Sequence, residues 1–259
     1  MIHRAIEERI HNALAKKKAV TIMGPRQVGK STLVDAIIPN DARILEINGD
    51  NTDVQTMFVN VDEAKMKVLI GNKNFLFVYE AQKIENVGNM LKIVAEKFKD
   101  VKIIVTGSSE FKLAEAVNES LTGRKREFRL YPLSFKEMAD ETSTLEESRM
   151  IDHRLIYGYY PEVVTSPGDE KEVLKEIIDS YLYKDVMEEN NIAKPDKLVK
   201  LVQALAFQIG STVSANELAG LVIRIAQHAR EGPASKDVLE VRAQRSSLEL
   251  LRSQDKTYL

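Results

Sequence analysis

The sequence has no cysteine, few histidines and no long apolar run, and each absence excludes a class of protein. Without cysteine, the 259 residues contain no disulfide, no thiolate zinc site and no thiol nucleophile. The four histidines, at 3, 11, 153 and 228, lack metal-ligand spacing, so zinc chemistry is not expected. No apolar run approaches the roughly 20 residues that span a bilayer, and residues 1–4 lack a signal-peptide core. We therefore expect a cytoplasmic protein without membrane contact.

The chain also has little net charge. The formal charge is -2, so DNA binding would need a local basic patch rather than a global attraction. After Leu221 the tail carries seven Lys and Arg against five Asp and Glu, an excess too small to indicate nucleic acid. No G-x-S-x-G elbow or Ser-His-Asp system is present. The length suits one large α/β domain with a smaller appendage.

The first half of the chain alternates apolar strands with helical patterns. Ile6, Ile10 and Leu14 share one face of a helix that precedes the first strand. Strands are expected at residues 19–23, 43–47, 75–79, 101–106 and 127–131, and helices between them, for example at 30–38 and 87–98. This alternation is typical of a parallel sheet covered by helices on both faces.

The second half has no further strand signal. Helices are expected at residues 134–139, 145–157, 169–187 and 196–209, and another begins at 214–221. After Leu221 the sequence shows little sustained periodicity. The sequence therefore predicts a helical region behind the α/β domain.

A glycine-rich stretch separates the first strand from the following helix. Residues 24–31 match GxxxxGK[ST], a phosphate-binding pattern. Backbone N–H groups of such a loop converge on phosphates, Lys30 brings charge to the β- and γ-phosphates, and the Ser31 hydroxyl ligates Mg²⁺. We expect ATP and Mg²⁺ to bind here. The binding residues would be Gly24, Pro25, Arg26, Gln27, Val28, Gly29, Lys30, Ser31 and Thr32.

The third strand ends in a departure from the usual acidic pair. Residues 75–78 lead to Tyr79 and Glu80, where P-loop enzymes place a metal-holding Asp and a water-orienting Glu. Glu80 suits the second role, or it is a solvated acid at a strand end. A phenol with a pKa near 10 replaces the Asp poorly. Glu46 or Asp50, from the second strand and its following loop, is the alternative metal carboxylate.

The fourth strand ends in small polar residues, Thr106-Gly107-Ser108-Ser109. A hydroxyl at this place can reach the γ-phosphate or the attacking water, which makes Ser108 a candidate catalytic residue. The alternative is that Ser108 or Ser109 caps a helix that begins at Glu110. The sequence leaves both open.

With these motifs in order, the chain resembles the archaeal and bacterial AAA-superfamily ATP-binding proteins that carry a C-terminal domain of unknown function. The resemblance runs from about residue 4 to residue 221. It rests on GPRQVGKSTL at 24–33, EAQKI at 80–84, TGSS at 106–109, LTGR at 121–124, LYPLSF at 130–135 and YGYYPE at 157–162.

The resemblance implies a fold and a further site residue. The fold is an α/β P-loop NTPase of the RecA/AAA type, followed by a helical lid and a partial winged-helix-like C-terminus. Residues 1–140 would form the ATPase core, 141–195 the lid, and 196–259 a helical part with a partial helix-turn-helix and a divergent tail. Arg124 is implied as a charge-stabilising arginine, within its own chain or in a neighbouring subunit; otherwise it is one charge in a solvated run with Lys125 and Arg126.

Three features depart from the family pattern. Tyr79 replaces the expected Asp, and Tyr159 replaces a second glycine that usually precedes Tyr160 and Pro161. Family-like sequence fades after residues 216–221, where a recognition helix and another domain are expected. A frameshift or an early stop in the gene is one hypothesis for this ending.

The leading hypothesis is an AAA-type ATPase that couples ATP binding to rearrangement of its lid and C-terminal region. Glu80, Ser108 and Arg124 would be its catalytic residues. The protein would form a homo-oligomer, or it would bind a protein or DNA partner through its C-terminal region. The alternative is an ATP-dependent switch or DNA-associated regulator that barely hydrolyses ATP, which Tyr79 and the truncated helix-turn-helix favour. A small-molecule kinase shares the P-loop, but no acceptor site is visible.

Overall fold

The computed structural model describes residues 1–108, 120–180 and 195–209, together with residues 212, 214, 217, 218 and 220. The chain forms two compact units, Met1–Ile177 and Ile178–Leu259. Ser109, the tail after Leu221 and much of the expected helix-turn-helix lie outside the described residues. The expected winged-helix element and the domain boundaries at 140/141 and 195/196 therefore stay predictions.

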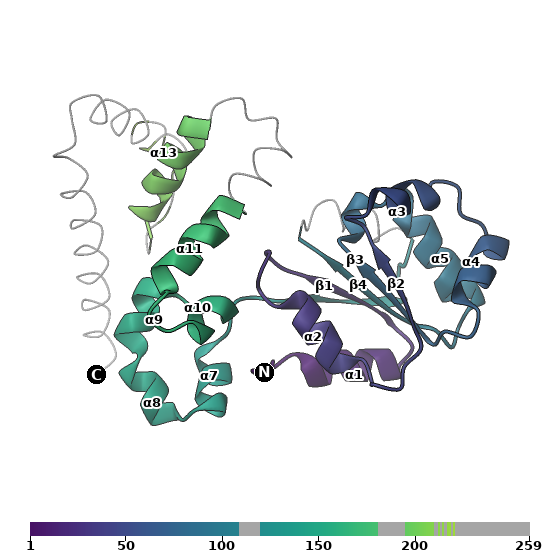
Figure 1. Cartoon of the computed structure of the whole chain (residues 1–259), viewed down its shortest axis with the longest axis horizontal. Helices are drawn as coiled ribbons and strands as arrows, with labels where there is room; N and C mark the ends of the chain where they lie inside the picture. The colour runs from purple at the N-terminus through teal and green to yellow at the C-terminus, as the bar shows by residue number, and fades with distance from the viewer. Residues whose placement is uncertain are drawn as a thin grey trace. The chain divides into compact units, whose positions relative to one another are not determined.

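The first unit is built on a five-stranded sheet (Figure 1). Its strands lie in the order β2-β3-β4-β1-β5, and all the neighbouring pairs are parallel. They are β1 Ala19–Met23, β2 Ile44–Asn48, β3 Phe75–Tyr79, β4 Lys102–Gly107 and β5 Lys125–Arg129. The three central strands are almost wholly buried, whereas the edge strands β2 and β5 are partly exposed. This arrangement confirms the predicted α/β fold.

Helices cover both faces of the sheet and form two separate cores. On one face, α1 (Glu7–Ala15) and α2 (Lys30–Ile37) pack through residues such as Ile10 and Leu33. On the other face, α4 (Glu63–Ile70) and α5 (Val87–Lys97) pack through residues such as Met66 and Leu91. The short helices α3 (Thr52–Met57) and η1 (Ala81–Lys83) lie in the connections on either side of β3. Both predicted helices, 30–38 and 87–98, are confirmed to within one residue.

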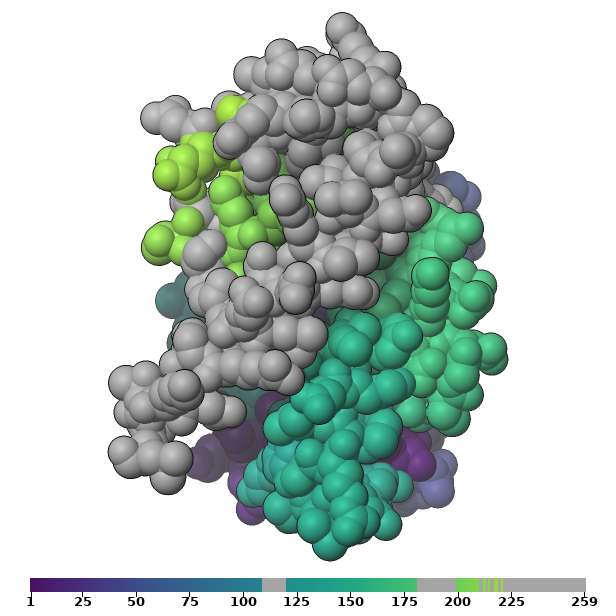
Figure 2. Space-filling model, turned by 90° about the vertical axis from the view of Figure 1, so that its left-hand side faces the viewer, coloured from purple at the N-terminus to yellow at the C-terminus, as the bar shows by residue number. Residues whose placement is uncertain are grey.

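A group of short helices follows β5 and forms the predicted helical region (Figure 1). Their residues are the teal to green atoms of the space-filling view (Figure 2). They are α7 Phe135–Glu141, α8 Thr144–Arg149, α9 Ile151–Tyr157, α10 Pro161–Thr165 and α11 Glu170–Ile178. We call α7 to α11 the lid helices. Val163, Val173 and Ile177 form their small buried core.

The single helix expected at 145–157 is wrong, because the chain forms α8 and α9 instead. The backbone leaves the helical conformation at Met150, where φ is -86° and ψ is 0°. The Met150 amide donates to both Glu146 and Glu147 carbonyls, which ends α8 in a tightened turn. Arg154 of α9 then donates to the Glu147 carboxylate at 3.0 Å, which ties the two helices together.

In the second unit, one helix is described in full, α13 from Pro195 to Ala206. It confirms the helix expected at 196–209. Residues 217, 218 and 220 are also helical, at the place where another helix was expected.

Candidate functional site

The P-loop, residues 24–29, leaves the end of β1 and leads directly into α2. The backbone of Gln27 and Gly29 is left-handed, with φ of 58° and 92°, and this curls the loop around the start of the helix. No side chain caps α2. Its first N–H groups, which have no partner within the helix, and the positive end of the helix dipole are therefore at the loop. A helix start of this kind is suited to hold phosphate.

Lys30 folds back across the mouth of this loop. Its ammonium donates to the carbonyl oxygens of Gly24 and Pro25, each at 2.9 Å. The side chain is only 8% exposed, so the charge is held at a defined place. The arrangement places a positive charge beside the N–H groups of the loop.

Two glycines of the loop are required for different reasons. A Cβ on Gly24 would lie 2.3 Å from the carbonyl oxygen of Leu130, so the chain leaving β5 excludes any side chain there. A Cβ on Gly29 would meet nothing closer than 3.7 Å, and its requirement comes from the left-handed backbone. The sequence pattern therefore matches both a packing and a conformational need.

Glu80 and Ser108 meet at the carboxyl ends of the parallel strands, beside the P-loop. Glu80 follows β3 and Ser108 follows β4, the strand that lies between β3 and β1. The Ser108 hydroxyl donates to the Glu80 carboxylate at 3.0 Å. Strands β1, β4 and β3 thus bring the P-loop, Ser108 and Glu80 to one edge, because the carboxyl ends of parallel strands meet there.

Gln82 completes this cluster and was not predicted as a site residue. Its amide nitrogen lies 2.7 Å from the Glu80 carboxylate and 3.1 Å from the Ser108 hydroxyl. Glu80 itself has a left-handed backbone, with φ of 41°. The buried amide oxygen of Gln82 has no hydrogen-bond partner within the described part of the chain. Its spacing, two residues after Glu80 in EAQKI, was the signal that could have found it.

Tyr79 lies on the face of the sheet that α1 and α2 cover. Its ring packs against Phe77, with the ring centroids 3.7 Å apart. Burial, and then the carboxylates of Glu46 and Asp35, raise the pKa of Tyr79 to about 12. The phenol is therefore protonated at neutral pH and is not an anionic metal ligand.

The alternative metal carboxylates do not assemble into a metal site. Asp50 pairs with Lys83 at 2.5 Å, while Glu46 is exposed on the edge strand β2. Within the described ranges, no three His, Cys, Asp or Glu side chains gather closely enough to hold an ion. Ser31, in the first turn of α2, is exposed and is the remaining predicted metal ligand.

Arg124 lies away from the P-loop. Its carbonyl accepts from the amide of Ala19, the first residue of β1, whereas the P-loop follows the last. Its guanidinium pairs with Glu96 at 2.8 Å. Arg124 is thus at the opposite edge of the sheet, so it does not meet Lys30 within one chain. A contribution from a neighbouring subunit stays a prediction.

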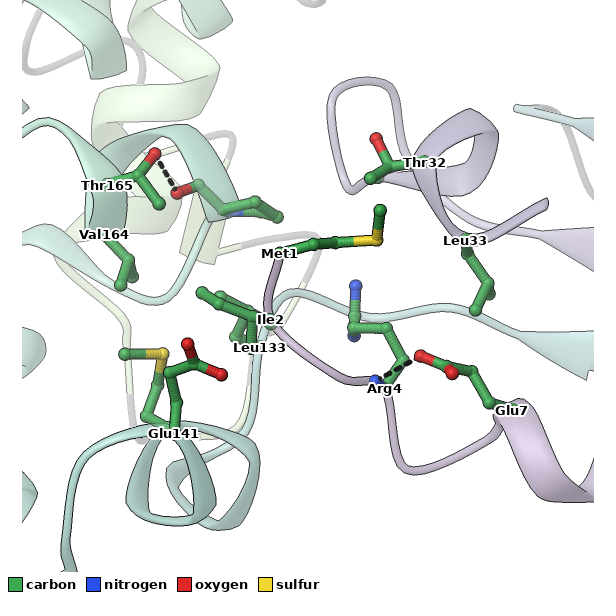
Figure 3. A pocket seen from close by; sticks show the side chains of 13 residues that line it. Met1, Ile2, Arg4, Glu7, Thr32, Leu33, Leu133, Glu141, Val164 and Thr165 are labelled. Carbon is green, nitrogen blue, oxygen red and sulfur yellow. Dashed lines mark hydrogen bonds between the residues drawn. The ribbon is translucent and has the colours of Figure 1, made fainter. Parts of the chain in front are cut away.

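A cavity of about 430 Å³ opens beside Gly29 and α2 (Figure 3). Its walls come from the N-terminal segment, α2 and the lid helices α7 and α10, and most of them are apolar. They include Met1, Ile2, Thr32, Leu33, Leu133, Met138, Glu141, Pro161, Val164 and Thr165. Of the predicted binding residues, Gly29 and Thr32 border this cavity. The sequence did not predict it, because segments far apart in the chain form it.

Buried Arg4 connects three of these segments and was also missed. Its guanidinium donates to the Val28 carbonyl at 3.0 Å, to the Tyr131 carbonyl at 2.6 Å and to Glu137 at 3.1 Å. Glu137 also accepts from the amides of Ala5 and Ser134. The P-loop is therefore bonded to the start of α7 through one side chain. In the sequence, the capping-box spacing of Ser134 and Glu137 indicates the start of α7, but it does not indicate the bonds of Arg4.

Comparison with known families and structures fits this geometry. An AAA-domain family model matches residues 16–139, and a second model, for a domain of unknown function, matches residues 148–231. Residues 16–139 thus resemble an AAA domain. A solved Walker-type ATPase of Pyrococcus abyssi has the same fold, with a TM-score of 0.52 and 16% identity over 87% of this chain and 89% of that one.

Two curated relatives are similar to this chain in sequence, and the chain covers only part of the length of each. An uncharacterized protein of Methanocaldococcus jannaschii is 25% identical over 85% of this chain and 53% of its own length. An uncharacterized protein of Haemophilus influenzae is 27% identical over 56% of this chain and 38% of its own length. The chain with this AAA domain thus spans about half of the first relative and less of the second. Among the described helices, none has the length and apolar content needed to cross a membrane.

Proposed function

We propose that the AAA domain binds ATP with Mg²⁺, hydrolyses it slowly, and couples its occupancy to the lid helices. The meeting of the P-loop, Ser108 and Glu80 at one sheet edge is the observation that supports this most directly. The P-loop fits a triphosphate because it combines an uncapped helix start with the held ammonium of Lys30. Ser31 would hold Mg²⁺, which supplies charge stabilisation to the transferring phosphoryl group when bound.

The cavity beside Gly29 supports binding of the nucleobase. Leu33, Leu133 and Val164 offer apolar contact to a flat ring, and Glu141 and Thr165 offer polar atoms. The volume of about 430 Å³ lies within the usual range for small-molecule pockets. A base in this cavity is next to the phosphates, because Gly29 borders both.

Glu80 is arranged to orient a water molecule for attack. Hydrogen bonds from Gln82 and Ser108 fix its carboxylate, so little side-chain freedom is lost when a substrate binds. Its role is to accept a hydrogen bond, and then a proton, from the attacking water. In this proposal Gln82 is a positioning residue, and its unpartnered amide oxygen is available to water.

The cavity walls also provide the coupling. A nucleotide in it would touch Thr32 of α2 together with Met138 of α7 and Pro161 of α10. Loss of the nucleotide removes these shared contacts, so the lid helices lose part of their connection to α2. The bonds of Arg4 to Val28 and Glu137 join the same segments without the ligand.

A nucleotide-dependent switch that barely hydrolyses ATP is the second candidate. The protonated Tyr79 phenol favours it, because no carboxylate follows β3 at the usual metal position. In this reading ATP binding alone sets the lid. A DNA-associated role through the C-terminal region belongs to the same candidate.

Single-turnover hydrolysis, measured beside ATP binding on the same preparation, separates the two candidates. The ATPase proposal predicts Mg²⁺-dependent phosphate release that Glu80→Gln abolishes while ATP binding is kept. Tight binding without phosphate release from the wild type would support the switch. Absence of ATP binding would contradict both.

Location and assembly complete the proposal. We place the protein in the cytoplasm. Proteins there rarely depend on disulfides, because thiols stay reduced, and this chain has no cysteine to form one. A homo-oligomer would bring Arg124 of one subunit to the nucleotide of the next. Any protein or DNA partner would bind through the C-terminal region.

A further inference from the structure

The amino ends of the strands, which form the edge of the sheet opposite the P-loop, carry a strongly basic surface. Strands β1, β4 and β5 begin there, and the chain segments that lead into these strands lie there too. We call it the basic face. Its nine basic residues are Arg9, Lys16, Lys17, Lys18, Lys99, Lys102, Arg124, Lys125 and Arg126.

Three carboxylates lie among these residues, and each pairs with one cation. The pairs are Lys17 with Asp100, Arg124 with Glu96, and Lys125 with Glu127. The six remaining cations have no carboxylate partner in the described ranges; they are Arg9, Lys16, Lys18, Lys99, Lys102 and Arg126. The face thus carries six net positive charges in a chain whose total is -2, so the rest of the chain carries -8.

Local structure accounts for only part of this charge. Helices α1 and α5 end at the face, and each helix end contributes roughly half a negative charge. Together they would balance about one cation. Lys102 lies 5.1 Å over the Phe75 ring and Arg9 lies 5.6 Å over the Phe128 ring, but these contacts leave both charges in place. An excess of several cations remains to be explained.

The shape and polarity of the face select one class of partner. Three adjoining hollows of about 360, 490 and 600 Å³ run across it. None of the exposed large apolar side chains in the described ranges lies on it. A protein interface usually has an apolar core, and a peripheral membrane site usually adds apolar side chains to its basic ones. A phosphodiester backbone needs neither, because its binding is driven by release of counterions.

We propose that the basic face binds the phosphodiester backbone of nucleic acid. The aromatic rings beside the face, Phe75 and Phe128, are buried at 3% and 7% exposure, so neither ring is free to stack on an unpaired base. Contacts to phosphates carry no sequence information. Binding is therefore independent of sequence and strongly dependent on salt. It does not rest on the function proposed for the P-loop, which lies at the other edge of the sheet.

The test uses the full chain and a fluorescent DNA duplex of about 30 base pairs in anisotropy titrations. With about four phosphate contacts, affinity should fall about a hundredfold between 50 and 200 mM salt. The triple variant Lys16→Gln/Lys99→Gln/Arg126→Gln should lose at least about tenfold in affinity at 50 mM salt and should flatten the salt slope. The matched control is Lys67→Gln/Lys171→Gln/Lys175→Gln, which removes the same charge from exposed lysines elsewhere.

Two kinds of result would overturn the proposal that the basic face binds nucleic acid. One is the absence of duplex binding at 50 mM salt, or an equal loss in both triple variants. The other is binding to phosphatidylserine vesicles or self-association in sedimentation that needs the same three residues, without duplex binding. Unfolding temperatures for both variants establish that they are folded. If the triple variant is not, the single variants Lys99→Gln and Arg126→Gln carry the same comparison, with a smaller expected loss.

Discussion

At the scale of single residues, Tyr79 decides how the site is expected to work. Lys30, Ser31 and Glu80 each have the side chain that ATP hydrolysis needs, whereas Tyr79 brings a partly buried, protonated phenol. The phenol packs on Phe77 and lies near Glu46 and Asp35. Binding does not depend on this position, because the P-loop and Lys30 hold the phosphates. The rate of hydrolysis does.

Replacing Tyr79 with aspartate should restore the missing carboxylate. We expect Tyr79→Asp to raise the single-turnover rate by roughly ten- to a thousandfold, about 1.4 to 4 kcal/mol of barrier, with a much smaller change in ATP affinity. The new charge would face Glu46 and Asp35, so the variant should unfold at a lower temperature without Mg²⁺ than with it. Phosphate release and thermal unfolding, each with and without Mg²⁺, measure both effects.

Tyr79→Phe is the matched control, since it keeps the ring and removes only the hydroxyl. It should leave the hydrolysis rate near that of the wild type. If Tyr79→Asp gains nothing while Glu46→Gln or Asp50→Asn abolishes turnover, another carboxylate holds the metal. A fast wild-type rate that Tyr79→Asp does not change would contradict an impaired site.

At the scale of helices and strands, the sequence predicted the sheet well where strands are fully buried. The central strands β1 and β3 match their expected bounds, because every residue in them is apolar or small and neighbours on both sides cover them. The edge strand β5 begins two residues before its expected start. Half-exposed Lys125 and exposed Arg126 gave no apolar signal there, and pairing with Ala19 and Val20 sets the register instead.

The site was predictable where it depends on local sequence. The P-loop and Glu80 follow from short motifs, since glycine, lysine and glutamate have specific tasks next to a strand end. The role of Arg4 depends on contacts with residues 24, 127 and 133 positions away, which no local pattern contains. Met150 could not be recognised as a helix break either, because methionine is a good helix former.

The first turn of α7 offers a test of the Arg4 connection. Burial alone would raise the pKa of Glu137, but the amides of Ser134 and Ala5 and the Arg4 guanidinium hold that pKa below its usual value. A lowered carboxyl pKa adds stability above the unfolded pKa near 4.3, and this is lost as pH falls through the folded pKa. Glu137→Gln should therefore cost about 1–3 kcal/mol at pH 7, and less as the pH falls below about 4.

Urea unfolding at several pH values measures this difference. Glu172→Gln, which neutralises an exposed carboxylate on α11, is the control and should change stability little at any pH. A cost for Glu137→Gln that stays the same from pH 7 to pH 3 would show that its charge is not what stabilises the segment.

At the scale of the whole molecule, the parallel sheet separates two kinds of surface. The carboxyl edge holds the P-loop, Ser108 and Glu80, and the amino edge holds Arg124 and the basic face. One chain cannot bring Arg124 to its own phosphates. Two chains can, if the amino edge of one faces the carboxyl edge of the next, and nucleic acid on the basic face would then compete with this contact.

An arginine supplied by a neighbour makes turnover depend on concentration. If Arg124 acts in this way, turnover per subunit should rise as the protein concentration rises, and Arg124→Ala should remove the rise while leaving the dilute rate unchanged. Initial rates over a wide range of protein concentrations measure this. A flat profile in the wild type, with no effect of the substitution, would leave Arg124 as a surface charge paired with Glu96.

Calorimetric titration of ATP in the presence of Mg²⁺ tests the central claim most directly. The wild type should bind, and Lys30→Ala should weaken binding at least tenfold, about 1.4 kcal/mol or more, because the held ammonium is the main charge directed at the phosphates. Lys16→Ala, which removes an exposed lysine at the opposite edge, should bind ATP as the wild type does. An unchanged affinity in a folded Lys30→Ala protein would contradict the account.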